Sequence, residues 1–229
     1  MSEQLKSAGP TGKDSTNQPA AGPPAMSLPA VGLSNPSNPS KAAPVNPLEN
    51  VNVAALKVIF WPDPRLKKKS ERVAVFDERL RELAARMLEL MREYKGVGLA
   101  APQVGLNLRL FVINPTGKPE DDKVYVNPIL SDPAGENEEK EEGCLSIPEI
   151  EVNITRPTIL KMQAQDVCGQ PFEQDASGFI SRIWQHENDH LDGRLIIDRM
   201  TPVAKMTHRK QLKKLEDDYL QEQAKKKKR

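Results

Sequence analysis

Two histidines spaced four residues apart, His186 and His190, are the residues of this chain best suited to chemistry. Residues i and i+4 of an α-helix lie on the same face, so both imidazoles can bind one metal ion. Glu187 follows His186 directly and can exchange a proton with water activated at such an ion. The chain has only three histidines, so chance rarely places two of them in this spacing. The segment therefore predicts a hydrolytic metal site.

A catalytic metal site that keeps an open position needs a third protein ligand. The residues alone leave two candidates. Glu216 lies on a predicted downstream helix, and Cys144 would offer a thiolate to a soft or borderline metal. The other cysteine, Cys168, lies in a polar, turn-like segment and is interpreted as structural. Spacing does not choose between the two candidates.

Charge is distributed unevenly along the chain, although the net charge is only +1. Residues 1–50 are neutral overall, residues 199–229 carry +7, and the segment between them carries −6. A basic tail on an acidic body indicates a polyanionic partner, and the alternative is a solubilising lysine run. We see no apolar run of about 18 residues and no secretory leader, so we expect neither a membrane span nor export. Two cysteines without a disulfide pattern favour a cytoplasmic protein.

Three helices are predicted to frame the candidate residues. An apolar stripe at helical spacing begins after Asp77 and stops at Gly96. The histidines lie on a second helix, with Ser177 as its cap and Gly193 as its end. A last helix begins at residues 201–202, with proline at its first position, and continues into the basic end. The apolar face predicted for the second helix includes Ile180, Ile183 and Leu191.

The strands precede the histidine helix without regular βαβ alternation, which predicts an α+β fold. Mostly antiparallel strands would pack around a central helix that carries the two histidines, with a C-terminal helix added. Apolar alternation predicts strands at 108–114, 124–130, 152–154 and 160–164, and glycine and proline predict turns at 133–135 and 167–171.

Composition divides the chain into three parts. Residues 1–52 form an extension rich in proline, serine and alanine that we expect to be disordered. Residues 53–203 would form the catalytic domain, with order beginning near Leu56. Residues 204–229 would form a basic C-terminal helix or tail.

Three separated motifs resemble those of the peptide deformylases, in particular the type 1 subgroup shared by bacteria and plastids. The first is the glycine-rich segment 96–103, which ends in Gln103. The second is Glu-Gly-Cys-Leu-Ser at 142–146, and the third is Gln-His-Glu-Asn-Asp-His-Leu at 185–191. Their order and spacing also match, over roughly residues 56–205. The resemblance implies a metal-dependent hydrolase that removes the formyl group from the N-terminal formyl-methionine of nascent polypeptides.

The same resemblance implies a set of ligands and a metal. Cys144 joins His186 and His190 as the third ligand. Fe²⁺ is the implied natural metal, with Zn²⁺ or Ni²⁺ able to replace it. Glu187 is then the catalytic proton carrier, and the side-chain amide of Gln103 would help to stabilise the developing oxyanion.

Further positions take roles from the resemblance. The backbone N–H of Leu145 is a second oxyanion donor. Gly98 and Gly143 would bind the substrate main chain, and Val97, Leu145 and Ile183 would line the methionine pocket.

Neighbouring charged residues have supporting roles in this interpretation. Asp189 is the candidate partner for a ligating histidine, and Glu142 with Arg156 would steady the loop of Cys144. Glu151 departs from the family, where an arginine is often found near the substrate entrance, and leaves substrate recognition at that edge open.

The expected partners are N-formyl-methionyl nascent peptides and the ribosome, the latter through the basic C-terminal helix. Neither a membrane nor a specific nucleic-acid sequence is expected as a partner. Two rival functions remain at this point. A zinc endopeptidase would use Glu or His as its third ligand. A binding protein with a closed structural site would add a fourth ligand, such as Cys168 or His208.

Overall fold

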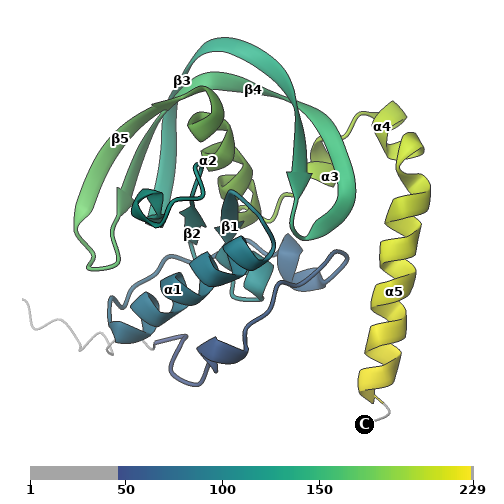
Figure 1. Cartoon of the computed structure of the whole chain (residues 1–229), viewed down its shortest axis with the longest axis horizontal. Coiled ribbons are helices and arrows are strands. Elements are labelled where there is room, and N and C mark those ends of the chain that lie inside the picture. The colour runs from purple at the N-terminus through teal and green to yellow at the C-terminus, as the bar shows by residue number, and fades with distance from the viewer. Residues whose placement is uncertain (1–45, 228–229) are drawn as a thin grey trace, which may run out of the picture. The chain divides into compact units, whose positions relative to one another are not determined.

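A computed structural model describes residues 46–227 of the chain (Figure 1). The expected α+β architecture is confirmed: a five-stranded antiparallel sheet in the order β1-β2-β3-β4-β5 curves around helix α2. The strands are β1 Gly98–Ala100, β2 Leu110–Ile113, β3 Lys123–Cys144, β4 Ile147–Gln165 and β5 Pro171–Ser177. The α-helices are α1 Glu78–Glu93, α2 Gly178–Leu191, α3 Ile196–Arg199, α4 Pro202–Thr207 and α5 Arg209–Lys227. Short 3₁₀ helices span Val53–Ala55, Pro64–Lys67, Ala101–Val104 and Pro119–Asp121.

Helix α1 forms where the apolar stripe predicted it. Asp77 caps the helix, because its carboxylate accepts a hydrogen bond from the backbone N–H of Leu80 at 3.1 Å. The apolar face is fully buried and packs with β1 and β2 in one core cluster. The chain leaves the helix at Gly96, whose N–H donates to the carbonyl of Met91 at 2.8 Å. This exit leads directly into β1, which forms part of the cleft described below.

Strands β3 and β4 form a long hairpin that the sequence patterns divided into shorter pieces. The predicted turn at 133–135 is wrong, because β3 continues through it with local shifts of register. Gly135 lies at φ +75, a conformation that glycine adopts without strain and that suits such an irregularity. The two strands predicted at 152–154 and 160–164 are both parts of β4. The predicted turn at 167–171 is confirmed as the β4–β5 connection, but β5 itself was not predicted.

Helix α2 is the central helix, as expected, and contacts all five strands. Ser177 is its N-cap residue but makes no side-chain hydrogen bond there. Ile183 and Leu191 are buried, whereas Ile180 is 36% exposed and does not belong to the core. Gly193, at φ +71, follows the helix and turns the chain. These contacts with all five strands fix the orientation of α2, and with it the direction in which its histidines point.

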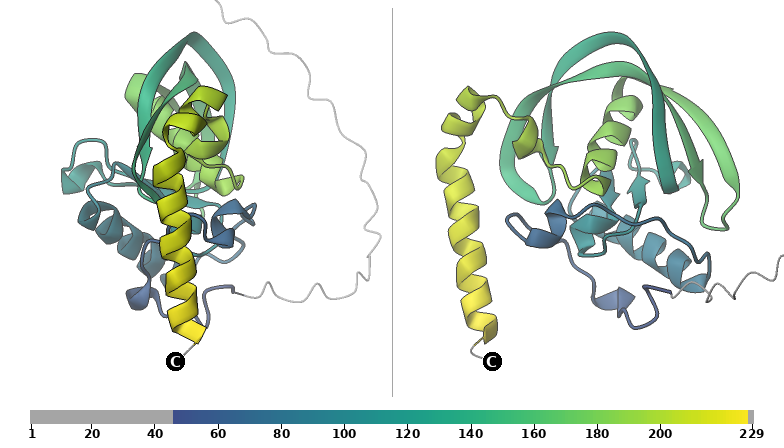
Figure 2. Two further views of the ribbon diagram at one scale, coloured as in Figure 1. Left: turned by 90° about the vertical axis from the view of Figure 1, so that its right-hand side faces the viewer. Right: turned by 180° about the vertical axis from the view of Figure 1, so that it is seen from behind.

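The C-terminal region forms two helices where one was predicted. Thr201 caps α4, accepting from the N–H of Ala204 at 3.2 Å, as expected of a helix with proline at its first position. His208 separates α4 from α5. Leu212 and Leu215 of α5 pack against a core cluster formed largely by the β3–β4 hairpin. Figure 2 shows α5 beside that hairpin, with its remaining faces open to solvent.

The folded part begins earlier than residue 53. Leu48 is 2% exposed and belongs to the core cluster of α1. The side-chain amide of Asn46 donates to Asp77 at 2.6 Å and ties this segment to the start of α1. Most of the predicted disordered extension, residues 1–45, lies outside the described residues. Within residues 46–227, no helix is both long and apolar enough to cross a membrane.

Candidate metal centre and active site

Three residues from two elements meet at one point of the fold. Cys144 is the last residue of β3, and His186 and His190 lie on the face of α2 turned toward it. Their ligand atoms all lie within 4.8 Å of one another. Cys144 Sγ is 3.4 Å from His190 Nε2, close to the roughly 3.6 Å that separates sulfur and nitrogen ligands around a tetrahedral ion. This set of donors fits a divalent transition metal and leaves one coordination position open.

Within residues 46–227, none of the alternative ligands considered from the sequence belongs to this cluster. Glu216 lies on α5, away from α2. Cys168 is exposed at the β4–β5 turn, where the guanidinium of Arg81 donates to its Sγ at 3.9 Å. His208 lines the same cleft as the cluster without being part of it. A closed, four-ligand structural site therefore finds no support, and neither does an endopeptidase with Glu as its third ligand.

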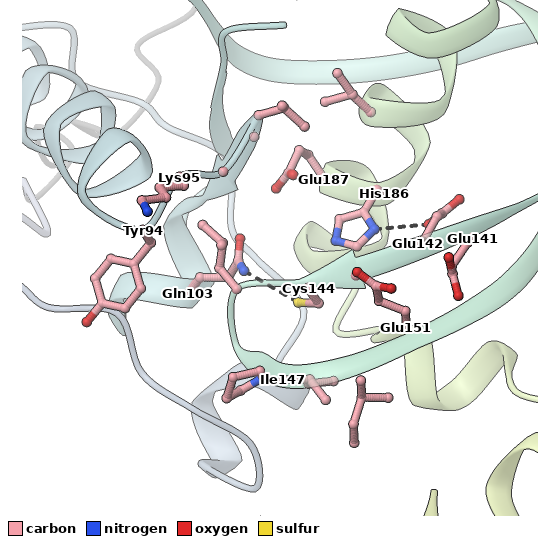
Figure 3. A pocket seen from close by; sticks show the side chains of 18 of the residues that line it. Tyr94, Lys95, Gln103, Glu141, Glu142, Cys144, Ile147, Glu151, His186 and Glu187 are labelled. Atoms are coloured by element: carbon pink, nitrogen blue, oxygen red, sulfur yellow. Dashed lines mark hydrogen bonds and ion pairs between the residues drawn. The ribbon is translucent and has the colours of Figure 1, made fainter. Parts of the chain in front are cut away.

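Glu142 holds His186 in place. Its carboxylate accepts a hydrogen bond from His186 Nδ1 at 3.0 Å, which turns the other ring nitrogen toward the ligand cluster (Figure 3). The prediction that Asp189 plays this part is wrong. Asp189 instead accepts from Arg156 at 3.0 Å and from Arg199 at 2.6 Å. The carboxylate next to the histidine comes from β3, 44 positions away in sequence.

Two buried arginines complete this network around Glu142. Arg156 donates twice to Glu142, at 2.6 and 2.8 Å, which confirms the suspected pairing of these residues. Arg182 donates to Glu142 at 2.7 Å and to the carbonyl of Ile154 at 2.9 Å. Glu142 thus accepts three hydrogen bonds from guanidinium N–H groups, two of Arg156 and one of Arg182. A buried carboxylate bound in this way is held rigidly, since each bond restricts its movement in another direction. The network fixes β3, β4 and α2 relative to one another at the ligand cluster.

Burial and neighbouring charges shift the pKa values of the titratable groups around the cluster in different directions. Burial opposes ionisation of Glu142, but hydrogen bonds from Arg156 and His186 hold its pKa far below the usual range. Burial also opposes a charged His186, but hydrogen bonds with Cys144 and Glu142 raise its pKa well above normal. Burial lowers the pKa of His190 well below normal, and the charges of His186 and Arg156 add to that effect. A metal ion would act against protonation of His186, since ligation needs the neutral ring.

Glu187 lies beside the cluster in a different environment. It is 3% exposed, and its Oε2 has no hydrogen-bond partner within residues 46–227. Burial raises its pKa to about 7. The backbone of Gly98 lies against it so closely that a Cβ at that position would come within 2.3 Å of Glu187 Oε1, far inside van der Waals contact. Glycine at 98 therefore makes room for the carboxylate, and a carboxyl group with a pKa near neutrality suits proton transfer.

Gln103 lies beside the ligand cluster, with its side-chain amide near Cys144. It is 1% exposed on the 3₁₀ helix after β1. Its Oε1 accepts from the N–H of Ala100 at 2.9 Å, and its Nε2 donates to Ser146 at 3.2 Å. The same Nε2 lies 3.7 Å from Cys144 Sγ. The amide is thus fixed with its N–H groups toward the metal-ligand side of the cleft (Figure 3).

A cleft of about 1020 Å³ opens over the cluster. Helix α2, β1 with its flanking residues, and the β3–β4 hairpin form its walls. Five residues predicted from the sequence to bind substrate all line it: Val97, Gly98, Gly143, Leu145 and Ile183. Ile183 is 4% exposed and Val97 is 39% exposed, so the apolar lining runs from the interior to the opening.

Several cleft residues have no counterpart among the sequence predictions. Phe60 and Tyr94 form a tilted aromatic pair at the opening, with ring centroids 6.3 Å apart. Phe179 lines the cleft from the start of α2 and is 56% exposed. No local pattern marks Phe60 or Phe179. The helical spacing that includes Tyr94 predicts core packing, which is wrong for this residue, because Tyr94 is 40% exposed and lines the cleft. The three residues come from segments that precede, follow and begin helices, and only the fold brings them to one opening.

The sequence matches the family described as polypeptide deformylase over residues 55–206, which is more than half of the chain. The chain belongs to the polypeptide deformylase family. The matched segment contains the ligand cluster, Glu187 and Gln103. The family is metal-dependent, and the Cys-His-His cluster agrees with that property.

Known peptide deformylases resemble this chain in sequence and in structure. Peptide deformylase 1B, chloroplastic/mitochondrial, of Arabidopsis thaliana is 42% identical over 166 residues, which cover 72% of this chain and 61% of that protein. Peptide deformylase of Thermotoga maritima is 44% identical over 156 residues, covering 68% of this chain and 93% of that protein. The crystal structure of a plant peptide deformylase superposes with a TM-score of 0.71 at 40% identity, covering 73% of this chain and 92% of the other.

The match stops short of the full length of the plant relatives. The chain spans 61% and 62% of the Arabidopsis and rice deformylases. The region matched by the family nevertheless includes the whole curved sheet and α2 of this chain. The likeness therefore extends to every element that positions the ligand cluster.

Proposed function

We propose that this protein is a metal-dependent hydrolase that removes the formyl group from the N-terminal formyl-methionine of nascent polypeptides and releases formate. One observation carries the proposal. A three-ligand Cys-His-His cluster lies at the base of a cleft beside Glu187, a buried carboxylate with an unpartnered oxygen. The membership in the deformylase family and the names of its relatives support the same reaction.

In this proposal Cys144, His186 and His190 would hold a divalent ion, which would supply a Lewis acid and acidify water. Glu187 takes the proton of the attacking water and delivers it to the departing amine. Its pKa near 7 suits both transfers, since the group can accept and release a proton at neutral pH.

The other roles are those proposed from the sequence. The amide of Gln103 and the backbone N–H of Leu145 donate to the oxyanion that forms at the formyl carbon. Gln103 is held for this role by its bonds to Ala100 and Ser146. Gly98 and Gly143 bind the substrate main chain, because backbone without a side chain allows close approach. Val97, Leu145 and Ile183 enclose the methionine side chain, and all three line the cleft.

We propose Fe²⁺ as the natural metal, with Zn²⁺ or Ni²⁺ able to occupy the site. A mixed thiolate and imidazole set binds all three ions. Chelation should abolish formate release from a formyl-methionyl tripeptide, and Fe²⁺ or Ni²⁺ added without oxygen should restore it. Full activity of metal-depleted protein would contradict the proposal. Exposure to air should inactivate the iron form, because Fe²⁺ and the Cys144 thiolate are both oxidisable.

The basic helix α5 is proposed to bind the ribosome. Leu212 and Leu215 turn toward the core, which leaves the lysines of the remaining faces in solvent. Lys213 pairs with Asp217 and Lys226 pairs with Glu222 within the helix. Lys210, Lys214 and Lys225 form no ion pair among the described residues and are free to meet phosphate. Contacts of this kind release counterions and weaken steeply with salt.

Charge substitution tests this contact without disturbing the core. The triple variant Lys210→Gln, Lys214→Gln, Lys225→Gln should cosediment less with ribosomes at low salt. The variant Lys57→Gln, Lys118→Gln, Lys123→Gln makes the same change of charge on exposed residues outside α5 and is the matched control. Equal cosedimentation of the two variants would show that α5 is only a solubilising helix.

The cytoplasm is the proposed location, on the basis of two free cysteines and the absence of a disulfide pattern. The name of the Arabidopsis relative places that protein in chloroplasts and mitochondria. Cell fractionation followed by immunodetection separates the two possibilities, and recovery in an organelle fraction would overturn the cytoplasmic proposal.

A further inference from the structure

The opening of the cleft carries three exposed glutamates on the β3–β4 hairpin. Glu141, Glu149 and Glu151 all line the cleft. None of the three carboxylates forms an ion pair or a hydrogen bond within residues 46–227, whereas Glu138 of the same hairpin pairs with Lys140 at 2.8 Å. Glu149 lies at φ +62, an uncommon conformation for a residue with a side chain. Unpaired carboxylates held at one opening create a negative local potential.

Glu151 lies beside the backbone that the proposed function assigns to substrate binding. It is the direct cross-strand partner of Gly143. A Cβ placed on Gly143 would be 3.6 Å from Cγ and 3.9 Å from Oε1 of Glu151. A peptide whose main chain bonds to Gly143 therefore passes the Glu151 carboxylate at short range. Figure 3 shows this carboxylate on the cleft side of the hairpin.

Positive charge at the cleft does not neutralise this opening. Arg182 lines the cleft, but its guanidinium is engaged by Glu142 and by the carbonyl of Ile154. Lys95 is exposed on the opposite wall, next to Gly96. One lysine faces three carboxylates across the opening, so the balance there is negative.

The acidic opening differs from an ordinary acidic surface because it leads into a cleft with features of a ligand-binding site. Glu187 at its base is 97% removed from solvent and has an oxygen without a partner. In the proposed reaction the formyl end of the peptide lies at that base. The residues that follow formyl-methionine must then leave through the acidic opening, because the base is closed by buried residues of α2 and β1.

We propose that Glu151, with Glu141 and Glu149, makes the enzyme selective for peptides that carry lysine or arginine in the first two positions after formyl-methionine. The inference rests on the proposed deformylase function and names a class of substrate within it. Charge complementarity at a partly exposed opening favours the matching substrate and disfavours acidic ones. Because these carboxylates face solvent, the selectivity should decrease as salt increases.

The test compares the metal-loaded full chain on C-terminally amidated peptides. Formyl-Met-Lys-Ala and formyl-Met-Ala-Lys are measured against the corresponding glutamate peptides, with formyl-Met-Ala-Ala as the neutral reference. Formate release at low salt should give kcat/KM about tenfold higher for the better lysine peptide than for its glutamate counterpart, as expected for several charges acting across a few ångströms of solvent. At 0.5 M salt, where the screening length is a few ångströms, the ratio should fall to about twofold.

Variants assign the effect to the hairpin. Glu151→Gln should reduce the lysine-to-glutamate ratio, and the triple variant with Glu141→Gln and Glu149→Gln should abolish it. Glu139→Gln changes an exposed residue of β3 that does not line the cleft, and it should keep the ratio of the unchanged protein. A ratio compares two peptides on one preparation, so any general loss of activity cancels.

The outcomes separate this inference from the proposed function. Formate release from the neutral peptide, combined with equal rates on lysine and glutamate peptides, would overturn the selectivity and leave the deformylase function standing. A preference that survives in the triple variant would also overturn it. No formate from any peptide would overturn the proposed function and this inference together.

Discussion

Glutamates at the base of the cleft and glutamates at its opening have opposite environments. Glu142 and Glu187 at the base are buried, whereas Glu141 and Glu151 at the opening are exposed and unpaired. Even within the base the two differ: Glu142 accepts from two arginines and a histidine, and Glu187 has an oxygen with no partner. The pKa is held far below normal in Glu142 and raised to about 7 in Glu187.

This comparison teaches that side-chain type does not determine the role of a glutamate here. A buried carboxylate with charged donors is permanently ionised and acts as a rigid support. A buried carboxylate without them can exchange a proton near neutral pH. An exposed carboxylate acts on a substrate only through its field, which salt screens.

The largest losses should come from residues at the ligand cluster itself. Cys144→Ala or His186→Ala should lose both the metal and detectable formate release, because two ligands hold a divalent ion weakly. Glu187→Ala should keep its metal and lose about 10²–10⁴-fold in turnover, since it removes a proton carrier and not a ligand. Metal analysis beside the activity assay distinguishes the two classes. Loss of metal from Glu187→Ala with retention in His186→Ala would reverse the assigned roles.

Glu142→Gln should be the next largest change. It leaves Arg156 and Arg182 without a full counter-charge in a buried place, which costs about 3–5 kcal/mol of the free energy of unfolding. It also removes the ionised acceptor of His186, so metal affinity should fall about 10–100-fold. Thermal unfolding and metal titration measure the two effects. Glu141→Gln, at the preceding, exposed residue, is the control and should change the free energy of unfolding by less than about 0.5 kcal/mol. Similar losses of stability in both variants would contradict the difference between the glutamates at the base of the cleft and those at its opening.

Two glycines of the cleft should respond differently to the same added methyl group. Gly98→Ala would force the Glu187 carboxylate to move, since the added Cβ meets Oε1 at 2.3 Å. We expect turnover to fall by about tenfold to a hundredfold, because proton transfer requires close positioning. At Gly143 the nearest atom lies at 3.6 Å, an ordinary contact. Gly143→Ala should therefore act mainly on KM by hindering the peptide main chain, and steady-state kinetics that show the reverse pattern would argue against both assignments.

The smallest predicted effect concerns α5, where a longer deletion should differ from a shorter one. Deletion of residues 221–229 removes no residue of a core cluster within the described part of the chain, so the melting temperature and tripeptide turnover should stay nearly unchanged. Deletion of residues 205–229 also removes Leu212 and Leu215 from their core cluster and His208 from the cleft wall. The loss of apolar burial should cost about 1–3 kcal/mol. Thermal melts of the two truncated chains decide this, and equal stability would show that α5 contributes nothing to the core.

Local patterns predicted a large part of the candidate site. Residues four apart lie on one face of any α-helix, so the shared face of His186 and His190 could be predicted without knowledge of the fold. The apolar stripe of α1, beginning after Asp77, was predictable for the same reason, and the structure shows that Asp77 caps the helix. Cys144 was one of two candidate third ligands, and only the resemblance of its motif to a family favoured it over Glu216. No spacing rule joins a residue on β3 to two residues on α2.

Errors in the sequence interpretation fall where distant segments meet. Asp189 was assigned to a histidine because it is close in sequence, yet its carboxylate turns to Arg156 and Arg199. The turn predicted at 133–135 is part of β3, because pairing with β4 continues past a glycine that alone would suggest a turn. The apolar assignment of Ile180 fails because the first turn of α2 is exposed, with Phe179 at 56% and Ile180 at 36%.

The sequence by itself determined which chemistry this protein can carry: two helical histidines, an adjacent carboxylate and an available thiol. It did so because those relations are set by residue type and by the regular geometry of a single helix. Only the tertiary structure decided which glutamate supports the metal site, which one can exchange a proton and which ones face the departing peptide. Those roles depend on burial and on partners supplied by distant strands and helices, and these exist only once the β3–β4 hairpin has closed around α2.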